Sequence, residues 1–93
     1  MYVHLGGMTV IQADEIVAIF NVDIQSTSPI TGEFLKQAKR EGRVEVIDVN
    51  EIKSVIITRD RVYYSPISSL TLKRRSNDSA SGVLHHNRVG DLI

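Results

Sequence analysis

Residues 50–65 read "NEIKSVIITRDRVYYS" and predict a β-hairpin. Residues 55–57 are Val-Ile-Ile and residues 62–64 are Val-Tyr-Tyr, so each arm carries apolar or aromatic side chains, and the polar run "TRDR" forms the turn between them. Pro66 ends the second arm, because proline cannot donate a hydrogen bond into a strand ladder. We place this hairpin in the small, mainly antiparallel sheet of an α+β domain.

The segments on the N-terminal side of the hairpin add further strands. "YVHLGGMTVIQ" (residues 2–12) predicts two strands joined by a turn at Gly6 and Gly7, which can adopt positive φ. "IVAIFNV" (residues 16–22) is apolar almost throughout, so we expect both of its faces to be covered, either in the domain centre or by a second subunit. "RVEVIDV" (residues 43–49) alternates as a half-buried strand does.

Residues 28–41 predict the one principal helix. Ser28 is a good N-cap, and Pro29 suits the first helical position, where its missing N–H is not needed. Gly42 ends the helix as a C′ glycine, whereas Gly32 is expected to weaken it by up to about 1 kcal/mol relative to alanine. Four apolar residues at spacings of three and four predict a single buried face: Ile30, Phe34, Leu35 and Ala38.

The C-terminal third of the chain changes character at Ser76. "ISSLTLKRR" (residues 67–75) predicts a short helix, with an edge strand as the alternative. Residues 76–93 are small, polar and poor in apolar side chains, so we expect a disordered polar tail unless a partner orders it. The sequence therefore predicts one domain over residues 1–75.

The charges balance overall but are segregated along the chain. The 93 residues contain 11 Lys or Arg and 11 Asp or Glu. Residues 1–27 carry three carboxylates and no Lys or Arg, whereas residues 52–75 carry six cations and one carboxylate, Asp60. Lys36, Lys39 and Arg40 gather near the end of the predicted helix, where cations favour its dipole. Because electrostatic fields act through patches, a cationic surface for phosphate remains open despite the zero net charge.

Several function classes find no support in the composition. The chain has no cysteine, no signal-peptide pattern and no apolar run long enough for a membrane span, which predicts a cytoplasmic protein without disulfides. The histidines, His4 with the adjacent His85 and His86, do not have the spacing of a metal site. Neither a nucleophile elbow nor a phosphate-binding glycine loop is present. We expect no enzymatic activity, no cofactor, no metal, no small-molecule substrate and no membrane partner.

Six cations are candidate contacts to the phosphates of double-stranded DNA. One subunit with two or three such contacts would bind weakly and lose affinity steeply with salt. Several copies along one duplex would bind far better, so DNA binding should require an oligomer. In the alternative interpretation, "KRR" only keeps the end of the domain soluble. The candidates are Lys53, Arg59, Arg61, Lys73, Arg74 and Arg75, and Tyr63 and Tyr64 are assigned to core or interface packing.

Five segments together resemble the RemA/RemB family of extracellular matrix regulators, and more closely its RemB branch. They are "MYVHLGG", "TVIQADEIVAIF", "SPITGEFLKQAKREGRVEVI", "KSVIIT" and "VYYSPISSLTLKRR". The resemblance implies a subunit with a fold similar to the LytTR DNA-binding domain. It also implies closed homo-oligomeric rings that bind DNA and activate biofilm matrix genes. Mixed assembly with a RemA-type relative belongs to the alternative function given below.

The chain departs from the RemA-type pattern at three positions. Glu15, Asn50 and Glu51 stand where RemA-type proteins carry arginines, which implies fewer phosphate contacts and added repulsion. The alternative function is therefore a ring-forming protein-interaction module of the same regulatory pathway that binds DNA weakly or not at all. Pro29 matches a family position and is assigned to helix initiation and ring packing.

Overall fold

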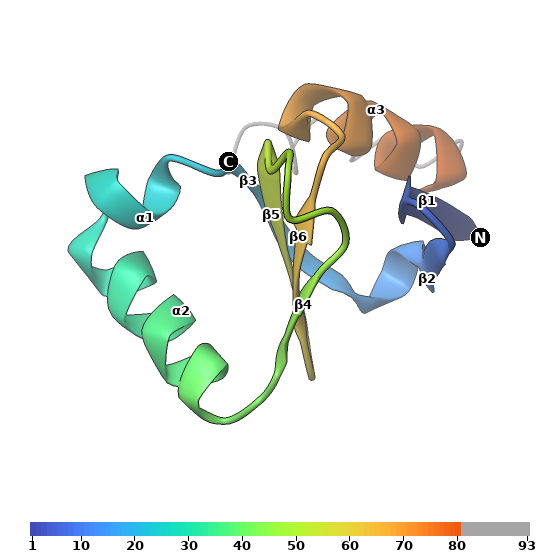
Figure 1. Cartoon of the computed structure of the whole chain (residues 1–93). Coiled ribbons are helices and arrows are strands. Elements are labelled where there is room, and N and C mark those ends of the chain that lie inside the picture. The colour runs from blue at the N-terminus through green and yellow to red at the C-terminus, as the bar shows by residue number, and fades with distance from the viewer. Residues whose placement is uncertain (81–93) are drawn as a thin grey trace.

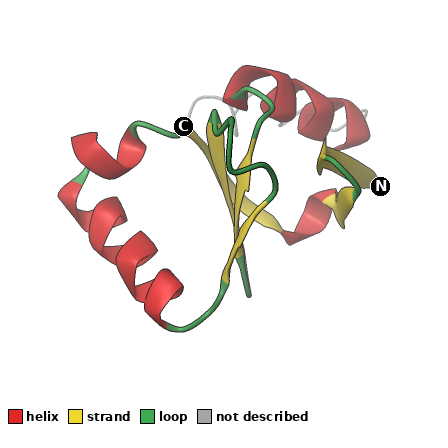
Figure 2. Cartoon of the chain, in the orientation of Figure 1, coloured by secondary structure: helices red, strands yellow, loops and turns green. Residues whose placement is uncertain are grey.

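The computed structural model describes residues 1–80, in which two small sheets and three α-helices form one α+β unit (Figures 1 and 2). Residues 81–93, which include His85 and His86 and most of the predicted tail, lie outside the described residues. The elements in chain order are β1 (Tyr2–Gly6), β2 (Thr9–Gln12), the 3₁₀ turn η1 (Ala13–Glu15), β3 (Ile16–Asn21), α1 (Ile24–Thr27), α2 (Pro29–Arg40), β4 (Val44–Val46), β5 (Ser54–Thr58), β6 (Val62–Ser65) and α3 (Ser69–Ala80).

The predicted hairpin of β5 and β6 is confirmed and forms the middle of the larger sheet, whose strand order is β3-β5-β6-β4. Val55 and Ile56 are fully buried because this strand is covered on both faces. The β3–β5 and β5–β6 pairs are antiparallel, but β4 pairs in parallel with β6, so the sheet is mixed. Only Val44–Val46 of the predicted strand 43–49 joins it.

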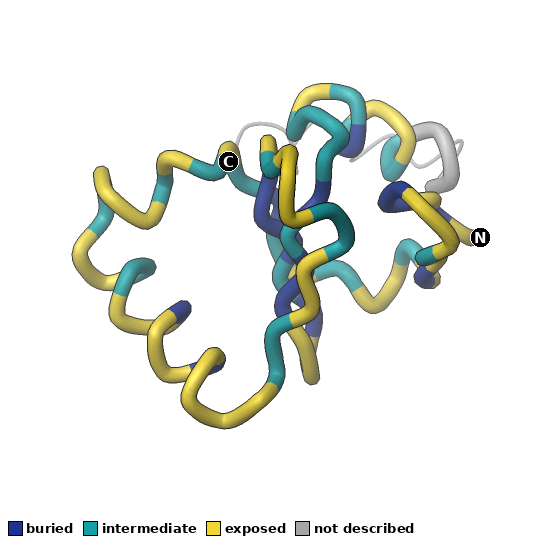
Figure 3. Tube along the Cα trace, viewed as in Figure 1, coloured by how far each residue is buried: buried dark blue, intermediate teal, exposed yellow. Residues whose placement is uncertain are grey.

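Each face of this sheet has its own apolar core. Figure 1 shows α2 on one side of the sheet and α3 with the β1–β2 hairpin on the other. On one face, Leu35 and Ala38 of α2 pack on Val55 and Val62. On the other, residues from the β1–β2 hairpin and from α3 pack on the sheet, and Leu72 of α3 is fully buried there. Figure 3 shows that burial is concentrated on the strands, while α2 exposes most of its length to solvent.

β3 corrects one of the two expectations for residues 16–22, cover at the centre of the domain, whereas cover by a second subunit stays a prediction. β3 ends the sheet rather than occupying its centre, and Val17 is 63% exposed. The register shifts between Ile16 and Ala18, which pair with Thr58 and Ile57, so Val17 is an extra, bulged residue. The bulge interrupts the regular ladder at this point of the edge strand and leaves Val17 facing solvent within one chain.

The ends of α2 are as predicted, but its apolar face is narrower. The Thr31 N–H donates to the Ser28 hydroxyl at 3.3 Å, and Gly42 has φ 71°, which confirms both caps. However, Ile30 is 84% exposed and Phe34 is 39% exposed, so the expectation that both are buried is wrong. The core beneath α2 is formed around Leu35 and Ala38 with Val55 and Val62, so the side of the helix that carries Ile30 remains in solvent.

Packing against a neighbouring helix requires glycine at position 32, which the sequence alone did not reveal. The single-turn helix α1, which was not predicted, lies directly against α2. A Cβ atom at Gly32 would lie 2.8 Å from the carbonyl oxygen of Gln25 in α1. Glycine is therefore needed for the two helices to approach this closely, and is not simply a weak point in α2.

α3 is as long as α2, with 12 residues each, so the expectation of one principal helix with a short C-terminal one is wrong. Ser68 caps it, since the Thr71 N–H donates to the Ser68 hydroxyl at 3.2 Å. Burial of Leu72 then fixes it against the sheet. The helix continues to Ala80, so the boundary expected after Arg75 falls inside it.

Buried polar contacts attach the β1–β2 hairpin to the rest of the domain. The Ser65 hydroxyl at the end of β6 donates to the Leu5 carbonyl at 2.6 Å and accepts from the Ile67 N–H at 3.0 Å. Gly6, with φ 117°, lies so close to Pro66 that an added Cβ would come within 3.0 Å of its ring. The turn at Gly6 and Gly7 is as predicted.

Candidate nucleic-acid interface

The turn between β5 and β6 presents two of the predicted DNA contacts, Arg59 and Arg61, both exposed. Thr58 fixes the turn through its backbone N–H and its hydroxyl, which both donate to the Arg61 carbonyl at 2.9 Å. The Arg61 N–H in return donates to the Thr58 hydroxyl at 3.0 Å. Within residues 1–80, neither guanidinium forms an ion pair. Two cations are thus held on a rigid turn.

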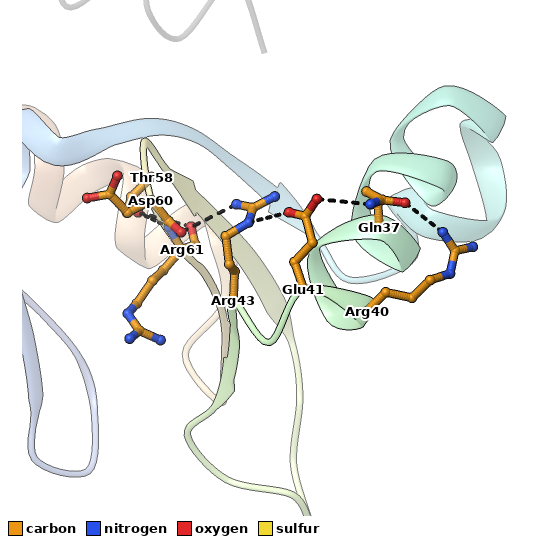
Figure 4. A network of polar contacts seen from close by, with 7 residues as sticks. All are labelled: Gln37, Arg40, Glu41, Arg43, Thr58, Asp60 and Arg61. Carbon is orange, nitrogen blue, oxygen red and sulfur yellow. Dashed lines mark hydrogen bonds and ion pairs between the residues drawn. The ribbon is translucent and has the colours of Figure 1, made fainter.

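One further arginine, Arg43, which the sequence analysis did not assign to this site, contacts the turn, and a row of polar contacts leads from it to Arg40 at the end of α2 (Figure 4). Arg43 donates to the Asp60 carbonyl at 3.3 Å and pairs with Glu41 at 2.7 Å. Glu41 accepts from Gln37, which accepts from Arg40 at 2.6 Å. We call Arg40, Arg43, Arg59 and Arg61 the arginine rim. No local sequence signal marks Arg43, because its place beside the turn depends on a contact between distant residues: the Val62 N–H donates to its carbonyl at 2.9 Å.

Carboxylates limit the positive potential of the arginine rim. The hydrogen bond from the Gln37 amide, followed by that from Arg43, holds the pKa of Glu41 below its usual range, so Glu41 is ionised and offsets one cation. Ile16 pairs with Thr58, which brings Glu15 to the same end of the sheet. Burial raises the pKa of Tyr63, and the carboxylates of Glu45 and Glu15 raise it further while Arg61 lowers it. The Glu15 carboxylate thus lies at the same end of the sheet as Arg59 and Arg61.

Lys53 lies at the opposite end of β5 from Arg59. The strand spans Ser54–Thr58, so six residue steps separate the two cations, or roughly 20 Å. Glu51 pairs with the Lys53 ammonium at 3.3 Å. The Glu51 carboxylate therefore compensates the charge of Lys53.

The "KRR" run lies on α3, separate from both of these places. Lys73 is half-buried and Arg74 is exposed. Arg75 donates to the His4 carbonyl in β1 at 2.9 Å, so it attaches the helix to the N-terminal hairpin. The six predicted contacts thus occupy three separate places: the hairpin turn, the start of β5 and α3.

The residues assigned to fold or assembly are found in three different environments. Tyr63 is 9% exposed and belongs to a core, as predicted. Tyr64 is half-buried, its hydroxyl donates to Gln25 at 3.3 Å, and burial raises its pKa. Pro29 is exposed at the first position of α2, which fits helix initiation.

Two further observations concern other kinds of site. In the described part of the chain, no three histidine, aspartate or glutamate side chains are arranged to hold a metal ion. No helix in residues 1–80 is long and apolar enough to cross a membrane.

These features define a small α+β domain with a mixed sheet and arginines gathered at one end of that sheet. The family described as "RemA-like: Extracellular matrix regulatory protein A-like" matches residues 2–75. Extracellular matrix regulatory protein B of Bacillus subtilis (strain 168) is 44% identical over 77 residues, which is 82% of this chain and 90% of that protein. The chain belongs to the RemA-like family, and it is similar to the B protein.

Proposed function

We propose that this protein is a DNA-binding regulator of the transcription of extracellular matrix genes, acting in the cytoplasm as a closed ring of identical subunits. Membership of the RemA-like family and similarity to an extracellular matrix regulatory protein support the regulatory role. The observation that carries DNA binding is the turn of β5 and β6. It holds Arg59 and Arg61 exposed, without an ion pair in residues 1–80, where phosphate oxygens could replace water.

The two outer strands of the larger sheet support assembly. β3 and β4 each pair on one side only within the described residues, and they lie at opposite ends of the strand order. An exposed apolar residue lies on each edge, Val17 on β3 and Val46 on β4, and Ile30 and Phe34 are further exposed apolar residues on α2. A contact between one edge and the different, opposite edge of the next copy is head-to-tail, and closure of such contacts gives a ring. A LytTR-like subunit fold is part of this proposal.

Reversal of the charges at the turn tests the DNA contact. Arg59→Glu with Arg61→Glu should abolish the gel retardation of matrix-promoter DNA, because two cations become two carboxylates facing phosphate. Light scattering should give the same oligomer mass as the unaltered protein. Lys73→Glu with Arg74→Glu makes the same change of charge on α3 and tests that second group of candidate contacts separately. Retardation that survives in the first variant would remove Arg59 and Arg61 from the interface.

The alternative is a ring that regulates matrix production through a protein partner, for example a RemA-type relative, and binds DNA weakly or not at all. The Glu51–Lys53 ion pair and the position of Glu15 beside the turn favour it, since both oppose phosphate binding. On this alternative the purified ring should not retard promoter DNA at about 100 mM salt, where phosphate contacts still act. Salt-sensitive retardation under those conditions would contradict it.

A further inference from the structure

A hollow on the α2 face of the domain lies apart from the turn that carries Arg59 and Arg61. It has a volume of about 350 Å³. This is within the range of small-molecule pockets, roughly 300 to 1,000 Å³. Its lining comes from α1, from the middle of α2 and from β6: Gln25, Gly32, Leu35, Lys36, Lys39 and Tyr64. No sequence motif points to it, because the three elements meet only in the fold.

The inner wall of the hollow is apolar and fixed. Leu35 is 3% exposed and packs in the core beneath α2, and the half-buried Tyr64 packs against the same core. The Tyr64 hydroxyl donates to Oε1 of Gln25 at 3.3 Å, which leaves the Gln25 amide nitrogen as a donor. Gly32 sets the distance between α1 and α2, because an added Cβ would collide with the Gln25 carbonyl.

The outer part of the hollow is cationic. Lys36 and Lys39 lie one helical turn apart and both line it. No carboxylate is among the lining residues. Lys36 makes one long contact of 3.8 Å, to the exposed Glu33, and Lys39 forms no ion pair within residues 1–80. Two ammonium groups and an amide nitrogen are therefore available as donors around an apolar wall.

We propose that this hollow binds a phosphate ester of mononucleotide size. The phosphate would accept hydrogen bonds from Lys36 and Lys39, because charge-assisted bonds to phosphate oxygens are the strongest that these side chains can make. The apolar or planar part of the ligand would lie on Leu35 and Tyr64. The site is a second function beside DNA binding and does not depend on it.

Adenosine 5′-monophosphate, titrated calorimetrically into the full-length protein, is the first probe. The nucleotide should bind. Adenosine should bind with an affinity at least about tenfold lower, because it lacks the phosphate. Lys36→Gln with Lys39→Gln should lower the affinity for the nucleotide by about tenfold or more. Lys53→Gln with Arg74→Gln, which removes the same charge outside the hollow, should leave its affinity unchanged. Circular dichroism of each variant checks the fold.

Three outcomes would overturn the inference. Failure of the nucleotide to bind at concentrations up to about 1 mM would show that the hollow is not a ligand site. Equal affinity in the two double variants would show that general surface charge holds the nucleotide. The phosphate could also come from DNA: if Lys36→Gln with Lys39→Gln impairs only duplex retardation, the two lysines belong to the nucleic-acid interface. These results are independent of the Arg59 and Arg61 variants.

Discussion

At the scale of single residues, Gly32 shows how a packing requirement can look like a weakness. Glycine within a helix normally reduces its stability relative to alanine. Here the backbone of α1 occupies the space that a side chain would need, 2.8 Å from the missing Cβ. Whether glycine or alanine is more stable at this position depends on the neighbouring helix α1, whose position could not be predicted from the sequence.

Gly32→Ala should therefore lower the free energy of unfolding, by about 1 to 3 kcal/mol, as overpacking does. Chemical denaturation followed by circular dichroism measures the change. Gly42→Asn is a useful comparison, because the position has open space and φ 71°, which asparagine tolerates, so it should have a smaller effect. A Gly32→Ala protein more stable than the unaltered one would mean that α1 moves aside without loss.

Glu15 has an electrostatic role that follows from the pairing of Ile16 with Thr58. Glu15→Gln should tighten DNA binding by roughly two- to fivefold, the usual size of a screened surface charge effect, and should increase its salt dependence. Titrations of fluorescent promoter DNA at two salt concentrations measure both effects. Asp23→Asn makes the same charge change at the other end of β3 and should have little effect. Equal gains in both variants would show that only net charge matters.

At the scale of elements, the parts defined by local chemistry were predictable. The β5–β6 hairpin, the caps of α2 and the Gly6–Gly7 turn each depend on residues within a few positions of one another. Pairing across the sheet was not predictable in the same way. The parallel position of β4, the edge position of β3 and the exposure of Ile30 depend on which strands meet which helix.

The candidate site follows the same division. The exposure of Arg59 and Arg61 on a turn could be predicted from the hairpin alone. Arg43 could not, because its contact with Asp60 crosses between two elements. The role of Arg75 in attaching α3 to β1 could not be predicted from the sequence either. Each miss concerns a contact between residues far apart in the chain.

The attachment of the β1–β2 hairpin gives a prediction at this scale. Ser65→Ala should lower the free energy of unfolding by about 1 to 3 kcal/mol, because it leaves the buried Leu5 carbonyl and the Ile67 N–H without their partner. Thermal and chemical unfolding measure the loss. Ser26→Ala removes an exposed hydroxyl in α1 and should change stability by less than about 0.5 kcal/mol. Equal stability of the two variants would show that water replaces the buried hydroxyl.

At the scale of the whole molecule, the exposed apolar residues test assembly. Ile30 is 84% exposed, so Ile30→Asp should leave the subunit folded but lower the oligomer mass measured by light scattering, because a charge enters the contact. Leu70→Asp, at a residue 65% exposed on α3, should leave the mass unchanged. A full-size oligomer of Ile30→Asp would exclude this face from the interface, and unaltered protein with the mass of one subunit would contradict the ring.

The opposite placement of β3 and β4 in the strand order has a genetic consequence. In the proposed ring, copies joined through these two different edges would all point the same way, so every subunit would carry its β5–β6 turn on the same side of the ring. A variant subunit that assembles normally but has lost the DNA contact at its turn would enter rings together with unaltered subunits and interrupt their row of DNA contacts. Alleles of this kind would be dominant, and a cell producing both forms should behave more like the mutant than its gene dosage suggests.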